Sequence, residues 1–173
     1  MIATSDACSV RLAIETSAGI IVDTAVSKAA TALAAWRSNA AKPDDYVLLP
    51  EMIEKGPFAG FVAANDSRWR NALRWITYAT FQAEESKISS KTLDASLKST
   101  DPFVQKFLGA NGSFGPDFGL PADFVSKIIG QVGNFAEIYD RNLGPKTPNY
   151  IDRKGTLNAP WSEGGALYSP PWI

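Results

Sequence analysis

The spacing of apolar and polar positions predicts alternating strands and helices in the first part of the chain. Short apolar runs at 18–22, 46–49 and 58–64 are typical of buried strands. Between the first two runs, apolar residues recur at helical spacing over 25–41, and Asp23 stands where a helix-capping residue is expected. The order strand, helix, strand favours an α/β layer over an all-helical bundle.

Helical periodicity dominates the middle and later parts of the chain. The apolar stripe is clearest at 68–85 and 121–142, so the two longest helices are expected there. Glu137 and Arg141 are spaced to form an ion pair one turn apart in the second of these helices. Shorter helices are expected at 92–99 and 102–108.

The last part of the chain, 146–173, is rich in proline, glycine and aromatic residues. This composition predicts an ordered coil that wraps the rest of the fold rather than a helix. Trp69 and Trp75 fall in the predicted helix at 68–85, and we expect both to be buried in a core or between lobes.

Composition narrows the classes of function. The chain has 173 residues, of which 45% are apolar and 20% charged, which suits a globular domain with its own core. The formal net charge of -1 gives no reason to expect a nucleic-acid partner. The sequence contains no histidine and a single cysteine, Cys8, which removes the common catalytic triads, thiolate zinc sites and internal disulfides. We therefore expect no enzymatic activity, no metal and no cofactor.

Two further features concern the location of the protein. No apolar stretch is long enough to span a membrane, so we expect a chain that is not membrane-spanning. The N-terminus does not follow the pattern of a signal peptide, because Asp6 stands where positive charge is expected and Arg11 interrupts the apolar run. We expect that an export signal is either removed or absent.

Several stretches of the sequence together resemble one protein family. They are DDYVLLPE at 44–51, the helix at 69–85, VGNFAEIYDRNLGP at 132–145, and the tail at 157–171. With these motifs the chain is similar to the C-terminal half of the periplasmic solute-binding proteins of polar amino-acid ABC transporters. The nearest type is the general L-amino-acid, or glutamate/glutamine/aspartate/asparagine, binding protein. The match covers 32–173, so we interpret 1–31 as a divergent N-terminal segment, a remnant or a replacement of the second lobe.

The resemblance implies a fold and a mode of action. The implied fold is α/β, a partial lobe of the type II periplasmic-binding-protein kind with long helices and an irregular C-terminal tail. Members of the family bind an amino acid between two lobes, close over it and deliver it to a membrane permease. The resemblance thus implies a non-enzymatic, periplasmic amino-acid-binding fragment or half-receptor, with a polar L-amino acid and an ABC permease as partners.

The sequence departs from the family at the expected ligand contacts. The arginine that binds the ligand carboxylate in the family has no counterpart in this chain. The aspartate that binds the ligand amino group aligns with Ala29 when no gap is allowed, or with Asp23 after a slip of several residues. Asp23 is therefore either a ligand-binding residue or a helix cap.

Further alternatives concern Cys8 and the half of the family's proteins that has no match in this sequence. The resemblance of Cys8 to a family cysteine implies an intermolecular disulfide or an unpaired thiol, while a small buried apolar side chain is the other interpretation. Half a lobe leaves apolar surface to be covered, either by another protein chain or by a homo-oligomer. If ligand binding has been lost, the chain is a structural subunit of a larger complex.

Overall fold

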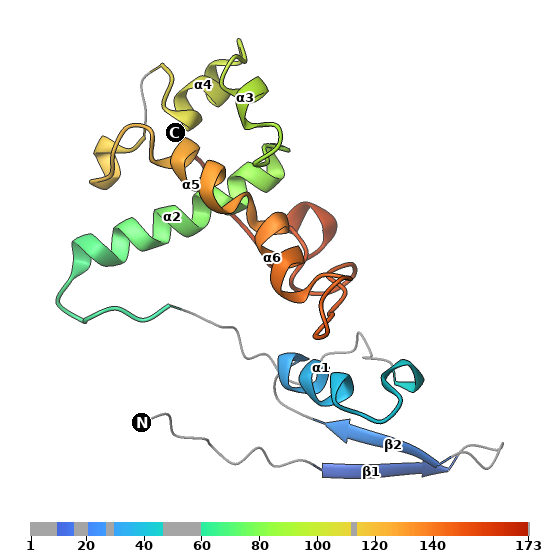
Figure 1. Cartoon of the computed structure of the whole chain (residues 1–173). Coiled ribbons are helices and arrows are strands. Elements are labelled where there is room, and N and C mark those ends of the chain that lie inside the picture. Colours follow the sequence, from blue (N-terminus) through green and yellow to red (C-terminus); the bar gives the residue numbers. More distant parts are fainter. Residues whose placement is uncertain (1–9, 16–20, 27–29, 47–59, 112–113, 173) are drawn as a thin grey trace. The chain divides into compact units, whose positions relative to one another are not determined.

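The computed structural model describes residues 10–15, 21–26, 30–46, 60–111 and 114–172. The chain divides into two compact units, which are described one at a time (Figure 1). Unit 1 comprises Met1–Ala59 with Leu143–Asp152, and unit 2 comprises Gly60–Asn142 with Arg153–Ile173. The sequence boundary proposed between residues 31 and 32 lies inside the first helix of unit 1, and it stays a prediction about sequence divergence.

Unit 1 contains a two-stranded antiparallel sheet. Strand β1 (Val10–Glu15) pairs with β2 (Ile21–Val26) in the register Val10↔Val26 to Glu15↔Ile21. Strand β1 was not predicted, although its apolar residues alternate with Arg11 and Glu15 in the period of two that marks a strand. The strand expected at 18–22 extends beyond its predicted end, to Val26.

The helix of unit 1 is shorter than predicted. Helix α1 (Ala30–Ser38) was expected over 25–41, but residues 25 and 26 belong to β2 and the helix ends three residues early. Ala34 is fully buried, and Trp36 packs edge to face against Tyr46 at 5.1 Å between ring centroids. A short 3-10 turn, η1 (Pro43–Asp45), follows α1.

The segment Leu143–Asp152 returns to this helix from far along the chain. Arg37 Nη2 donates to the carbonyl oxygen of Tyr150 at 3.0 Å, and Ser38 Oγ donates to Asn149 Oδ1 at 3.3 Å. The backbone N–H of Ile151 donates to the Leu143 carbonyl at 3.0 Å. Two of these bonds satisfy backbone carbonyls, those of Tyr150 and Leu143, and so hold the segment in place.

Two further strands were predicted. The one at 46–49 lies outside the described residues except for Tyr46, which is not in a strand. The one at 58–64 is wrong over its described part, because residues 60–64 form coil and the start of a turn. An apolar run pairs as a strand only where a neighbouring strand accepts its backbone hydrogen bonds, and the described residues of unit 2 offer none.

Helix α2 (Ser67–Glu85) confirms the helix predicted at 68–85 and is the longest helix of unit 2 in its described part (Figure 1). Asp66 caps it, because its Oδ1 accepts from the Trp69 N–H at 2.8 Å. Its buried side chains are Ala72, Ala79, Thr80 and Ala83. Small residues on this face let the neighbouring helices approach closely.

Two short helices follow α2, close to where the sequence placed them. They are α3 (Leu93–Ser96) and α4 (Pro102–Leu108). Asp101 caps α4 by accepting the N–H of Phe103 at 2.8 Å, and Gly109 ends it with φ 82°. Phe107 and Leu108, at the end of α4, enter the core of unit 2 with 1% exposure each.

The single long helix predicted at 121–142 is wrong, because the structure contains two. Helix α5 (Phe124–Val132) ends at Gly133, and α6 (Phe135–Leu143) begins after Asn134. Gly133 has φ 78°, a value that favours glycine, and Asn134 Oδ1 accepts the Glu137 N–H as an N-cap at 3.0 Å. The apolar stripe runs through both helices, so periodicity alone did not reveal the break.

The C-terminal tail is an ordered coil, as predicted. Its only helical turn in the described part is η3 (Trp161–Glu163), and an earlier loop contains η2 (Pro116–Phe118). The tail ends in the core, where the Trp172 indole is 5% exposed and its Nε1–H donates to Ser169 Oγ at 2.9 Å. The buried core of unit 2 consists of Ala79, Ala83, Ile88, Phe107, Leu108, Phe114, Phe124, Val125, Ile129 and Trp172.

Arg153 attaches the tail to α2. Its Nη1 and Nη2 contact the two carboxylate oxygens of Glu84 at 2.9 and 3.1 Å, and its Nε donates to the Asn158 carbonyl. The guanidinium also lies over the rings of Phe135 and Tyr139. Because both partners of the ion pair are about 85% buried, this contact is a paired, partly desolvated charge rather than a surface ion pair.

Within the described ranges, every helix is too short or too polar to cross a lipid bilayer.

Candidate functional site

Asp23, the predicted ligand-binding residue, lies in the middle of β2 and pairs with Ala13 of β1. The helix-cap interpretation is wrong, since β2 continues to Val26 and α1 begins only at Ala30. On β1, Arg11 and Glu15 stand two register positions to either side of Ala13. The ladder therefore places one basic and two acidic residues near each other along a pair of strands.

Cys8 and Ala29, the other residues singled out by the sequence, lie outside the described residues. The alternatives for Cys8 stay predictions. The arginine of the family has no assigned counterpart, so the structure contributes one backbone position, that of Asp23, to the predicted amino-acid site.

Unit 2 has an open hollow of about 360 Å³ at the start of α2. Ser67, Arg68, Asn71 and Trp75 line it from α2, and Asp117, Phe118 and Gly119 line it from the η2 loop. The Trp75 and Phe118 rings stack at 3.9 Å between centroids and 8° between planes, forming a rigid apolar base. A second hollow of about 260 Å³ lies beside it and shares Arg68 and Gly119.

The chemistry of this hollow is that of weak polar binding. Arg68 and Asn71 supply donors and Asp117 supplies an acceptor, and all three side chains are exposed. Hydrogen bonds made there compete with water, so each contributes little net free energy. This grouping was not predictable from the sequence, because its residues come from two segments that only the packing of the η2 loop against α2 brings together.

In the described residues of unit 2, the carboxylate of Glu137 accepts three hydrogen bonds. It accepts from the backbone N–H and the hydroxyl of Ser90, at 2.9 and 2.5 Å, and from the backbone N–H of Asn134 at 2.9 Å. Burial acts to raise the pKa of Glu137, but these hydrogen bonds, with a smaller contribution from Lys91, outweigh it and leave the pKa lowered.

The partners of Glu137 differ from the predicted ion pair. Arg141 instead donates from Nη2 to the Val132 carbonyl at 2.7 Å, so it supports the end of α5. Glu137 and Asn134 form a reciprocal cap at the start of α6, and Ser90 ties this cap to the loop before α3. The role of this carboxylate is to hold elements together.

The described residues contain no group of three or more His, Cys, Asp or Glu side chains that could hold a metal ion. No family model matches the chain.

Comparison with known proteins defines the class to which this fold belongs. A solved periplasmic binding protein of an ABC transporter from Brucella ovis, with glutathione bound, superposes on the chain with a TM-score of 0.72. The two sequences are 41% identical, and the match covers 82% of this chain and 44% of that one. The fold is therefore that of part of a periplasmic binding protein, as the resemblance implied.

Named relatives refine this class. The general L-amino acid-binding periplasmic protein AapJ of Rhizobium johnstonii is 38% identical over 131 residues, or 75% of this chain. The glutamate/glutamine/aspartate/asparagine-binding protein BztA of Rhodobacter capsulatus is 36% identical over 144 residues, or 83% of this chain. The chain is thus similar over most of its length to proteins named for amino-acid binding.

The chain spans about two fifths of the length of these relatives, 38% of AapJ and 42% of BztA. The relatives are named for binding rather than for catalysis. Because the chain spans less than half of each relative, what the whole relatives bind is a proposal for this chain.

Proposed function

We propose that this chain is the part of an amino-acid-binding ABC transporter protein that carries one set of ligand contacts, and that it makes and breaks no bonds. The observation that supports this most is the combination of 41% identity with a TM-score of 0.72 to a periplasmic binding protein. A shared fold by itself does not imply a shared function. A shared fold combined with 41% sequence identity is stronger support for a shared function.

The proposed ligand is a polar L-amino acid, because AapJ and BztA are named for such ligands. Glutathione, bound in the structural relative, carries the same α-amino and α-carboxylate groups on its γ-glutamyl residue. In this chain the ammonium group is assigned to Asp23 on β2, whose carboxylate would form a charge-assisted hydrogen bond with it. The proposed compartment is the periplasm, and the proposed delivery partner is an ABC permease.

A second proposal concerns the surface that a partial lobe exposes. Another protein chain, or a further copy of this one, would cover that surface and supply the ligand contacts without a counterpart here. The alternative of a structural subunit without ligand binding has no observation in its favour, since AapJ and BztA are both named for binding.

Backbone-amide NMR of the uniformly ¹⁵N-labelled chain tests the assignment of Asp23. Titration with L-glutamate should shift the amide signals of β1 and β2 in a saturable way, and D-glutamate should shift them much less. Asp23→Asn removes the charge with little change in size and should abolish the shifts, whereas Asp44→Asn in η1 should leave them unchanged. Shifts that persist in Asp23→Asn, or that are absent from β2, would overturn the assignment.

A further inference from the structure

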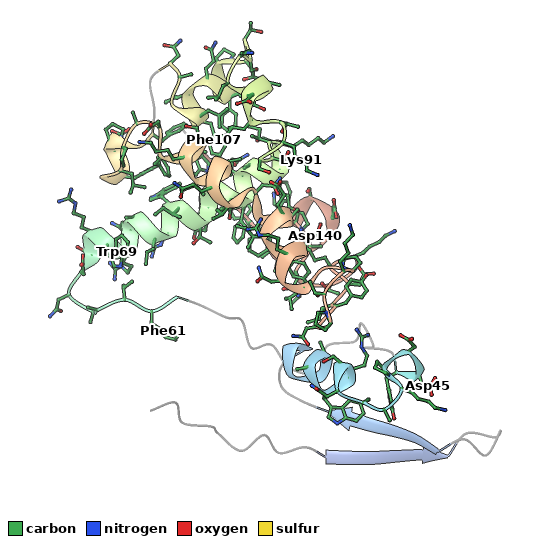
Figure 2. All side chains as sticks on the ribbon, in the orientation of Figure 1. Asp45, Phe61, Trp69, Lys91, Phe107 and Asp140 are labelled. Carbon is green, nitrogen blue, oxygen red and sulfur yellow. The ribbon has the colours of Figure 1, made fainter. Side chains whose placement is uncertain are left out.

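The first three turns of α2 carry an exposed face that combines aromatic and basic residues. Trp69, Leu73 and Thr77 form one ridge at i, i+4 spacing, and Arg70 and Arg74 form the ridge beside it. We refer to these five residues as the α2 face. Trp69 is 51% exposed, so the prediction that it is buried in a core is wrong, while burial between lobes stays a prediction; Figure 2 labels it at the start of α2.

Arg70 and Arg74 of the α2 face point away from the core of unit 2, whereas Trp69 borders the second hollow beside Ala72 and Leu120. The buried residues of α2 include Ala72, Ala79 and Ala83, which lie on the opposite side of the helix from Arg70 and Arg74. Both arginines are exposed. Within the part of the chain that the structure describes, neither guanidinium has a hydrogen-bonded or ionic partner.

This charge distribution is unfavourable for the free helix. The positive end of a helix dipole lies at the N-terminus, yet the first turn of α2 contains no acidic residue and does contain Arg68 and Arg70. Arg70 and Arg74 are like charges at i, i+4, which repel each other. No acidic residue occurs between Asp66, the cap, and Glu84. A helix with unfavourable charges at its N-terminus and between its arginines is expected where another interaction compensates for them.

We propose that the α2 face binds a carboxylate-rich surface of a partner protein. Charge complementarity identifies the chemistry of the partner, because each of the two guanidinium groups can bind a carboxylate through two parallel hydrogen bonds. Trp69 and the half-buried Leu73 offer apolar contact next to these forks, and tryptophan and arginine are the residue types that dominate binding energy in protein interfaces. Attraction to an anionic membrane uses larger clusters of basic residues than this face supplies. The inference goes beyond the proposed function and does not depend on an amino-acid ligand.

Fluorescence anisotropy with a short synthetic peptide of glutamate and leucine residues tests the proposal at low and physiological salt. The intact chain should bind the peptide, and binding should weaken as salt rises. The double variant Arg70→Glu/Arg74→Glu should weaken binding by about tenfold or more, since each charge-assisted hydrogen bond is worth about that factor. Arg70→Lys/Arg74→Lys should recover only part of the affinity, because lysine keeps the charge and loses the fork.

Two controls separate this outcome from unfolding and from net charge. The glutamate variant places acids near the positive end of α2, so thermal unfolding followed by circular dichroism should show a chain at least as stable as the original. Lys98→Glu/Lys146→Glu makes the same change in net charge at exposed positions elsewhere and should leave peptide binding roughly unchanged.

Four results would overturn the proposal. The first is that the peptide does not bind even at low salt. The second is that Lys98→Glu/Lys146→Glu loses as much affinity as Arg70→Glu/Arg74→Glu. Phosphatidylserine vesicles bind more tightly than the peptide with the same dependence on Arg70 and Arg74, which assigns the face to lipid. Sedimentation shows self-association that the arginine variant abolishes, which assigns the face to a second copy of the chain.

Discussion

At the scale of single residues, two ion pairs in unit 2 differ in how much they stabilise the fold. Arg153 and Glu84 are 15% and 16% exposed and are bonded through Nη1 and Nη2 of the guanidinium, while Lys127 and Asp123 are 61% and 49% exposed and one helical turn apart. The first pair joins residues 69 positions apart, and the second joins neighbours within one segment. Their removal should therefore have unequal effects.

Arg153→Lys should lower the free energy of unfolding by about 1–2 kcal/mol, because lysine cannot reproduce the fork or stack on Phe135 and Tyr139. Lys127→Ala should lower it by roughly 0.5 kcal/mol or less, as is usual for an exposed pair. Urea unfolding followed by tryptophan fluorescence measures both. Equal losses in the two variants would show that the tail does not depend on Arg153.

Glu137 should make stability depend on pH in the acid range. Because its folded-state pKa is lowered, its contribution is fully present above the ordinary value of 4.5 and is lost as pH falls through the lowered pKa. The urea midpoints of the original chain and of Glu137→Gln should differ most near neutral pH and converge on acidification. Glu163→Gln, at an exposed position in η3, is the matched control. A constant difference at all pH values would contradict the assignment.

At the scale of elements, local sequence predicts helices better than breaks between them. The caps Asp66 and Asp101 and the stripe of α2 were recognisable because capping and 3.6-residue periodicity are local properties. The break at Gly133 was missed although its signals are local, namely a glycine followed by the reciprocal cap of Asn134 and Glu137, because the apolar stripe continues through both helices. The Glu137 side chain occupies the space of a Cβ at residue 133.

Gly133→Ala should therefore lower the free energy of unfolding by about 1–3 kcal/mol, since alanine is strained at φ 78° and its Cβ would lie 2.5 Å from Glu137 Oε2. Gly130→Ala, inside α5, should be neutral or raise it by about 0.5–1 kcal/mol, because the nearest atom to the added Cβ is Leu93 Cδ2 at 3.4 Å. Chemical unfolding of the pair checks this. A stabilised Gly133→Ala would mean that α5 and α6 can join into the single helix that periodicity predicted.

Strands are harder to predict from local sequence than helices. β1 has a clear alternating pattern and was missed, and residues 60–64 have an apolar pattern yet form no strand. A strand depends on a partner that can lie far away in the sequence, so its pattern cannot decide its pairing. The same reason explains why the hollow beside α2 could not be predicted, because it requires the η2 loop to pack on the helix.

At the scale of the whole molecule, the tail completes the core of unit 2. The Trp172 indole has the rings of Trp75, Phe107, Phe114, Phe118 and Phe124 around it, at centroid distances of 5.0 to 6.2 Å. Composition predicted an ordered coil but not this anchor, since which tail aromatic is buried depends on the packing of four other segments.

Trp172→Ala should lower the free energy of unfolding by about 3–5 kcal/mol, the usual cost of removing a large buried ring. Trp161→Ala, at a 51% exposed position of the same tail, should cost less than about 1 kcal/mol. Urea unfolding with hydrogen exchange of the indole N–H groups distinguishes the two sites. Equal protection of both indoles would show that the tail does not close the core.

We infer that the chain carries part, and only part, of an amino-acid-binding site. Isothermal titration calorimetry of the purified chain with L-glutamate and L-glutamine tests it most directly. We expect a dissociation constant of about 1 mM or weaker, because each missing charged hydrogen bond costs roughly tenfold to a hundredfold in affinity. A micromolar constant for the chain alone would contradict it, since this chain would then supply the full set of ligand contacts.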